Sequence, residues 1–148
     1  MPRFRFKLQA VLNHREMIEQ EHQRAVAALE RERARLEESL RACQREITLE
    51  NSELRTELAH GNIIAARRQA ATTASIDARA RATAIELAGL LKRLQSARAA
   101  LLEAAKSRKA VELLRERHFE SWRTAEQKAD AAAVDEIVVM RAARKGEP

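Results

Sequence analysis

Apolar residues recur along most of this chain at alternating steps of three and four. This spacing keeps one row of side chains, the seam, facing a partner helix. In the C-terminal half the seam runs from residue 76 to residue 139. Fourteen of its nineteen positions are apolar, whereas 45% of the whole sequence is hydrophobic, so the repeat is real. The positions are Ile76, Ala80, Thr83, Leu87, Leu90, Leu94, Ala97, Leu101, Ala104, Arg108, Val111, Arg115, His118, Trp122, Ala125, Ala129, Ala132, Glu136 and Val139.

The N-terminal half carries the same repeat with one irregularity. Its first part comprises Leu8, Val11, Arg15, Ile18, His22, Ala25, Leu29, Glu32 and Leu36. The next apolar residue is Leu40, and Cys43, Ile47 and Leu54 then follow in a shifted frame. Two consecutive steps of four constitute a stutter, which locally unwinds a supercoil. We therefore expect a change of frame between residues 36 and 40.

Helix-breaking residues are rare, because glycine occurs only at positions 61, 89 and 146 and proline only at 2 and 148. The sequence around Gly61 is the best place for a chain reversal, and Thr72–Ser75 is an alternative start for the second helix. We predict one coiled-coil domain over residues 1–148: helix one at about 4–58, a turn at about 59–63, helix two at about 64–142 and a short disordered tail at 143–148. The predicted fold class is all-α, an antiparallel two-helix coiled-coil hairpin forming a long rod, with the second helix longer than the first.

A reversal at residue 61 pairs residue n with about residue 122 minus n, so the chain beyond Trp122 has no partner within the molecule. This overhang still carries a seam, and we expect another protein to cover it. Trp122 either packs on Phe4 or Phe6 at the end of the hairpin or anchors that partner. The candidate partner-binding residues are Arg115, Arg117, Trp122, Ala125, Ala129, Asp135, Glu136 and Ile137.

Composition narrows the possible functions. With 34% charged residues, three Phe, one Trp and no Tyr, the chain cannot fill a large globular core. The net charge of +6 arises entirely from residues 61–148. Such an excess attracts an acidic protein, anionic lipid or nucleic acid, but interspersed basic residues are more typical of a solvated helix face.

Residues with catalytic or metal-binding patterns are absent from the sequence. There is no glycine-rich phosphate loop, no His-Glu-x-x-His and no cysteine pair. We expect His22 and His118 to be polar seam residues and Cys43 to be a small buried hydrophobe. No apolar run is long enough for a signal peptide or a membrane span. The sequence therefore predicts a cytoplasmic protein that is not an enzyme, needs no cofactor or metal and does not insert into the membrane.

Both ends of the chain carry recognisable sequence motifs. The N-terminal motif is Phe4-Arg5-Phe6-Lys7-Leu8-Gln9-Ala10-Val11-Leu12, followed by Arg15 and Glu19. The C-terminal pattern is Arg108-Lys109-Ala110-Val111-Glu112-Leu113-Leu114-Arg115-Glu116-Arg117, then Glu126-Gln127-Lys128 and Asp135-Glu136-Ile137. In their order and in the length of chain that they span, these motifs resemble the FliJ family of the bacterial flagellar type III export apparatus.

The resemblance implies an antiparallel coiled coil similar to the central stalk of rotary ATPases. It also implies three partners: the hexameric export ATPase, the export-gate membrane protein and the export chaperones, which the family helps to recycle. The implied location is the cytoplasmic face of the inner membrane, reached through the export apparatus. Two alternatives stay open, namely the equivalent stalk of a virulence-type secretion system and a basic coiled coil on nucleic acid through Arg67, Arg68, Arg79 and Arg81. The lack of interleaved aromatic residues for base stacking argues against the second alternative.

Overall fold

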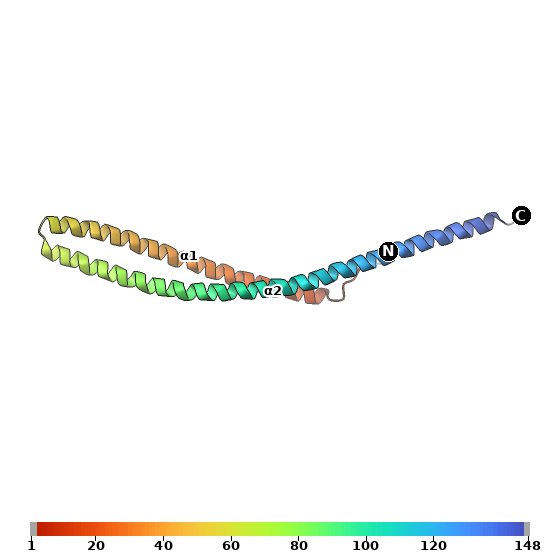
Figure 1. The fold of residues 1–148 in the computed structure, drawn as a ribbon, viewed down its shortest axis with the longest axis horizontal. Helices are drawn as coiled ribbons and strands as arrows, with labels where there is room; N and C mark the ends of the chain where they lie inside the picture. The colour runs from red at the N-terminus through yellow and green to blue at the C-terminus, as the bar shows by residue number, and fades with distance from the viewer. Residues whose placement is uncertain (1–2, 147–148) are drawn as a thin grey trace. The chain divides into compact units, whose positions relative to one another are not determined.

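The computed structural model describes residues 3–146 and consists of two long helices packed against each other (Figure 1). Helix α1 (Gln9–Ala59) has 51 residues and helix α2 (Ile63–Lys145) has 83. Over the described residues there is no strand. The predicted all-α hairpin with a longer second helix is therefore confirmed.

Contacts divide the described chain into two compact units. The turn unit is Gln20–Leu102, in which α1 and α2 lie side by side and are joined by the turn (Figure 1). The terminal unit contains the chain up to Glu19 and the chain from Glu103 onward. The description of the chain as one domain stays a prediction.

The turn connecting the helices is built around Gly61, as predicted. Gly61 has a φ of 74°, which glycine adopts without the steric cost that a Cβ imposes. The Asn62 N–H donates to the Glu57 carbonyl at 3.0 Å, and the Gly61 N–H donates to the Leu58 carbonyl at 3.1 Å, so the C-terminal carbonyls of α1 are satisfied. The Asn62 Oδ1 then accepts a hydrogen bond from the Ala65 N–H at 3.1 Å and caps the start of α2. These bonds end one helix and begin the next within three residues.

The seam of α2 is confirmed in the turn unit by the burial of its side chains. Leu90 and Leu94 are 0% and 1% exposed, and Ile76 is 7% exposed. The intervening seam positions are half-buried, whereas Ile85 and Leu91, which lie off the seam, are exposed. Cys43 of α1 is buried, as predicted for a small hydrophobe. The apolar repeat thus identifies the side chains that hold the two helices together.

The predicted stutter in α1 is wrong. Val26 and Arg33 are half-buried, whereas the predicted seam residue Ala25 is exposed. With these two residues the steps of three and four continue without interruption through Leu36, which is buried. Arginine contributes here because its long aliphatic stem can cover a seam while its charge reaches solvent. Within the turn unit, the half-buried and buried positions of α1 in this frame are His22, Val26, Leu29, Arg33, Leu36, Leu40, Cys43, Ile47, Glu50, Leu54 and Glu57.

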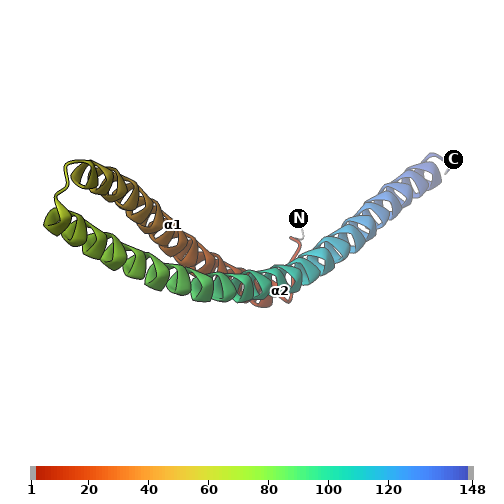
Figure 2. The same cartoon turned by 60° about the vertical axis from the view of Figure 1, so that its left-hand side comes forward.

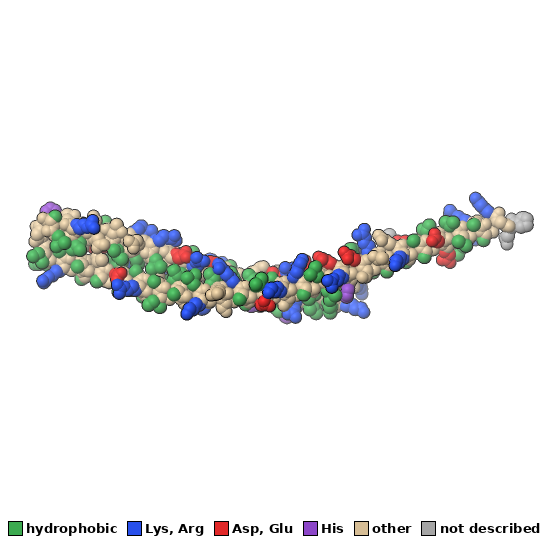
Figure 3. All heavy atoms as spheres, in the orientation of Figure 1, with side chains coloured by type: hydrophobic (Ala, Val, Ile, Leu, Met, Phe, Trp, Pro, Cys, Tyr) green, Lys and Arg blue, Asp and Glu red, His purple; other side chains and the backbone are tan. Residues whose placement is uncertain are grey.

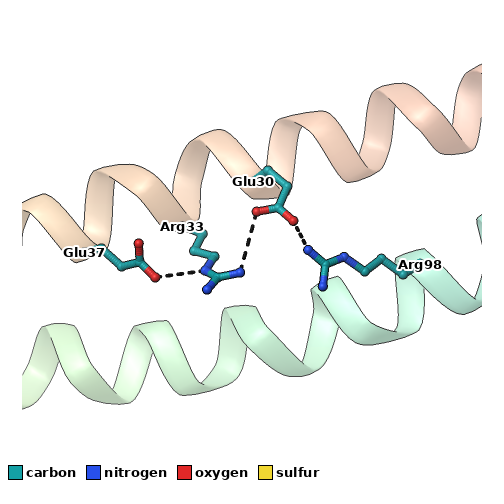
Figure 4. A network of polar contacts seen from close by, with 4 residues as sticks. All are labelled: Glu30, Arg33, Glu37 and Arg98. Atoms are coloured by element: carbon teal, nitrogen blue, oxygen red, sulfur yellow. Dashed lines mark hydrogen bonds and ion pairs between the residues drawn. The ribbon is translucent and has the colours of Figure 1, made fainter.

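Ion pairs line the edges of the helix pair in the turn unit. Glu30 joins the two helices by accepting from Arg98, and it also pairs with Arg33 of its own helix at 3.8 Å (Figure 4). Arg79 of α2 donates to Glu46 of α1 at 2.6 Å. Arg98 and Arg79 lie further along α2 than the residues that a reversal at residue 61 would place opposite Glu30 and Glu46. The difference is less than two helical turns in each case. Because the side chains are largely exposed, each pair contributes little stability but disfavours other alignments.

The helix boundaries differ from the predicted ones at both termini. Helix α1 begins at Gln9 rather than near residue 4, and α2 continues to Lys145 rather than ending near residue 142. Residues 143–145 are therefore helical, and residues 147–148 of the predicted disordered tail lie outside the described residues. Helix α2 also passes through Thr72–Ser75 without a break, which excludes the alternative turn.

Replacing Leu94 with alanine tests the seam. Because Leu94 is 1% exposed, Leu94→Ala should leave a cavity and lower the free energy of unfolding by about 2 to 4 kcal/mol. The matched control is Leu91→Ala, which removes the same atoms from a residue that is 42% exposed and should cost about 0.5 kcal/mol or less. Urea unfolding followed by circular dichroism measures both, and equal losses would contradict the assigned seam.

A pair of glycine substitutions tests the turn. Gly61→Ala places a Cβ on a residue with positive φ, so we expect a loss of about 1 kcal/mol even though no atom lies within 4 Å of that Cβ. Gly89→Ala makes the same change inside α2, where the Cβ also meets nothing within 4 Å, and should stabilise the protein by about 0.5 to 1 kcal/mol. Thermal unfolding of both variants checks the opposite signs.

Candidate protein-interaction site

In the terminal unit, the backbone of the residues before α1 runs beside α2 (Figure 2). Aromatic rings make the contacts between these two segments. The Phe4 ring lies edge-on to Phe119 with centroids 5.3 Å apart and is 5.8 Å from Trp122. The Phe6 ring lies edge-on to His118 at 5.7 Å. The reading in which Trp122 packs on Phe4 at the end of the intramolecular pairing is therefore confirmed.

The same contacts explain why α1 begins late. In a helix, side chains two positions apart point to different faces. Phe4 and Phe6 are two positions apart and both pack on α2, which a helical segment could not achieve. This arrangement buries Phe6 and Leu12, and it leaves the predicted seam residues Leu8 and Val11 38% and 39% exposed. The predicted seam of this first stretch is thus wrong, because aromatic packing sets where the helix starts.

A charged layer lies in the seam of the terminal unit. The Arg108 guanidinium donates to the Glu19 carboxylate of α1 and, at 2.5 Å, to Glu112 one turn along α2. The hydrogen bond with Glu19 raises the pKa of the Arg108 side chain, so the guanidinium stays protonated. Only 14% of the Glu19 side chain is exposed, so a shifted alignment would leave this carboxylate without its partner. Such a polar layer fixes the register of two helices.

An open groove lies beside the aromatic cluster. It has a volume of about 250 Å³ and is lined by Phe4, Glu112, Arg115, Glu116 and Phe119. Arg115, one of the predicted partner-binding residues, is exposed here, and so is Arg117. The groove combines apolar rings with charges of both signs, a combination suited to a protein surface rather than to a small molecule.

The C-terminal part of α2 has no cover within the described chain. Every residue from Gln127 to Gly146 is exposed, including the predicted site residues Ala129, Asp135, Glu136 and Ile137; Ala125 is exposed as well. We call residues 125–146 the overhang. Figure 3 shows hydrophobic side chains open on its surface among acidic and basic ones. Five large apolar residues are more than half exposed: Val134, Ile137, Val138, Val139 and Met140.

The strongest apolar face of the overhang is not the predicted seam. Val134, Ile137 and Val138 lie on one face because they are three and four positions apart. At 100° per residue, the predicted seam of Ala125, Ala129, Ala132 and Val139 lies on the opposite face. Val134 and Val138 were not among the predicted site residues, although their spacing from Ile137 is the signal that identifies them. The overhang is therefore apolar on two sides, which is unusual for a helix in water.

Two further properties of residues 3–146 concern metals and membranes. No group of three or more His, Cys, Asp or Glu side chains within this range is arranged to hold a metal ion. None of the helices in this range has a stretch both long and apolar enough to span a bilayer.

The fluorescence of the single tryptophan tests the aromatic cluster. Phe4→Ala removes the ring that lies 5.8 Å from Trp122, so the emission of Trp122 should shift to longer wavelength as water reaches the indole. The control Met17→Ala removes a side chain that is 59% exposed, and it should leave the emission unchanged. An unchanged spectrum for Phe4→Ala would show that the ring does not cover Trp122 in solution.

Comparison with known proteins identifies the family to which this chain belongs. Separate searches of curated proteins and of solved structures each gave no significant match. The family model described as "Flagellar FliJ protein" matches residues 4–147, nearly the whole chain, including the aromatic N-terminal segment and the overhang. The chain thus belongs to the FliJ family and is a component of the flagellar protein export apparatus.

Proposed function

We propose that this chain is a non-enzymatic, stalk-like coiled coil that binds and stimulates the hexameric export ATPase. In the same proposal it contacts the export-gate membrane protein and helps to recycle export chaperones. Membership of the FliJ family supports a role in the export apparatus. The observation that carries the proposal is the overhang, a helix with exposed apolar residues on two sides.

The overhang is suited to enter a ring of subunits. Burial of Val134, Ile137 and Val138 by a partner releases ordered water, and about 25 cal/mol is gained for each Å² of apolar surface covered. The helix is already formed, so little backbone entropy is lost on binding. A single helix that is apolar on two sides can contact several subunits of a ring at once.

Charge supports the approach of the partner. Arg115 and Arg117 are exposed immediately before the overhang, and Arg141, Arg144 and Lys145 are exposed at its end. These side chains can steer the chain toward an acidic pore and raise the rate of association. Attraction of this kind weakens with salt, whereas the apolar contact does not.

The turn unit offers a second apolar surface for the export gate or the chaperones. Leu58, Ile63 and Ile64 flank the turn and are 58%, 65% and 76% exposed. This surface is also the alternative place for ATPase binding if the overhang does not bind. A chain held by the gate in this way would be associated with the cytoplasmic face of the inner membrane without entering it.

The nucleic-acid alternative is less favoured by the side-chain contacts. Arg79 donates to Glu46, and Arg81 pairs with Asp77 at 2.9 Å, so two of its four proposed arginines are already neutralised. Binding through Arg67 and Arg68 would weaken steeply as salt is raised, because counterions are released from phosphates. The match to the flagellar FliJ family favours the flagellar stalk over the equivalent stalk of a virulence-type secretion system, and binding to each purified ATPase tests this preference.

Deletion of residues 125–148 tests the proposed role of the overhang. Because no described residue of this segment after Glu126 is covered, the truncated chain should keep its helical hairpin and nearly the same melting temperature. We expect it to lose most of its stimulation of the export ATPase, measured as phosphate release, and to support less flagellar export and motility in cells.

The melting temperature, measured by circular dichroism, is the control for folding in this experiment. Full stimulation by a folded, truncated chain would contradict binding through the overhang. Combined substitution of Ile63 and Ile64 by serine would then test the turn surface in the same assay. If neither change affects stimulation, the proposed ATPase function is wrong.

A further inference from the structure

Charged residues flank the exposed apolar face of the overhang in a particular order. Glu126 and Asp130 come before Val134, and Arg141, Arg144 and Lys145 come after Val138. At 100° per residue, all five fall on the same side of α2 as Val134, Ile137 and Val138. This face is therefore acidic at its start, apolar in the middle and basic at its end.

None of these five side chains forms an ion pair with another described residue. The ion pairs of the terminal unit are made by Glu19, Glu103, Lys106, Arg108, Lys109 and Glu112. Asp130 and Arg141 are eleven positions apart on one helix, too far for their side chains to meet. Among the described residues, nothing neutralises the acidic and basic ends of this face.

A face with this order is complementary to itself when one copy is reversed. We propose that two copies of this chain associate antiparallel through the segment of α2 from Glu126 to Lys145. Reversal about residues 135 and 136 places Asp130 opposite Arg141 of the second copy and Glu126 opposite Lys145 of the second copy. It also places Val134 opposite Ile137 and Val138 of the second copy. The same contact is made twice, as a two-fold axis requires.

Other occupants fit this face less well. A parallel second copy would put Asp130 against Asp130 and Arg141 against Arg141, which is repulsive. An anionic lipid surface would be repelled by Glu126 and Asp130, which lie on the same side as the apolar residues. The apolar centre comprises only a few side chains, so the interface is small. We expect a weak association, with a dissociation constant on the order of micromolar to hundreds of micromolar.

Sedimentation velocity of the purified full-length chain tests the association. The weight-average mass should rise from one chain toward two as the concentration is raised from about 1 µM to about 500 µM. Val138→Asp should abolish this rise, because it places a charge at the centre of the contact. A mass that stays at one chain over the whole range, or a dimer that Val138→Asp leaves intact, would overturn the proposal.

Charge exchange tests the antiparallel arrangement. Asp130→Arg and Arg141→Asp should each weaken the dimer by roughly tenfold or more, because each puts like charges together at two places. The double variant carrying both substitutions should associate about as tightly as the original chain. An equimolar mixture of the two single variants should also form dimers, since their charges complement each other. Failure of the double variant to recover would overturn the antiparallel contact.

Lys128→Glu is the matched control for the charge exchange. It reverses an exposed charge that lies away from the apolar face, and it should change the dissociation constant less than twofold. Circular dichroism verifies that every variant keeps its helices. The inference does not rest on the proposed function, because these measurements use the purified chain without the ATPase. A chain that does not self-associate would contradict the dimer proposal but not the ATPase proposal. A chain that does not stimulate the ATPase would contradict the ATPase proposal but not the dimer proposal.

Discussion

Burial of a narrow apolar stripe between two helices is the interaction on which the rest of this protein depends. Most helical stability in proteins comes from the packing of an apolar face rather than from intrinsic helix propensity. Here that packing is concentrated in a few side chains, with Leu90 and Leu94 fully buried in the turn unit. Most other side chains are at least partly exposed. The buried side chains that stabilise the protein therefore form a stripe between two helices rather than a globular core.

A stripe of this kind defines the interface but does not by itself fix the alignment. Many seam residues are alanine or leucine, which can pack in several registers at similar cost. The alignment of the two helices depends instead on features that form in one register only. These are the reversal at Gly61 and the ion pair between Arg108 and Glu19. The aromatic packing of Phe4 on Trp122 then ends the pairing in the terminal unit. Polar and aromatic contacts thus provide the specificity that the apolar repeat lacks.

The unequal lengths of α1 and α2 have a functional consequence. Within the described residues, every side chain of α2 after Glu126 is exposed, including apolar ones such as Ile137 and Val138. Exposed apolar surface normally promotes association, and in this chain it is interrupted by charges that favour particular partners. In the two proposals made above, this segment would bind the ATPase and, in the absence of the ATPase, a second copy of the chain. Both uses would compete for the same side chains.

The sequence by itself determined the two helices, the place of the turn and the seam of α2 in the turn unit, because helical periodicity and the Gly61-Asn62 pair act locally and are visible in one chain. Tertiary structure decided the late start of α1, the frame containing Val26 and Arg33, and the strongest apolar face of the overhang. In an Ala- and Arg-rich helix several faces have similar apolar content. The face that becomes buried therefore depends on which side chains of the partner helix lie opposite it. Likewise, the unwound segment around Phe4 and Phe6 exists only because rings on α2 are there to receive it.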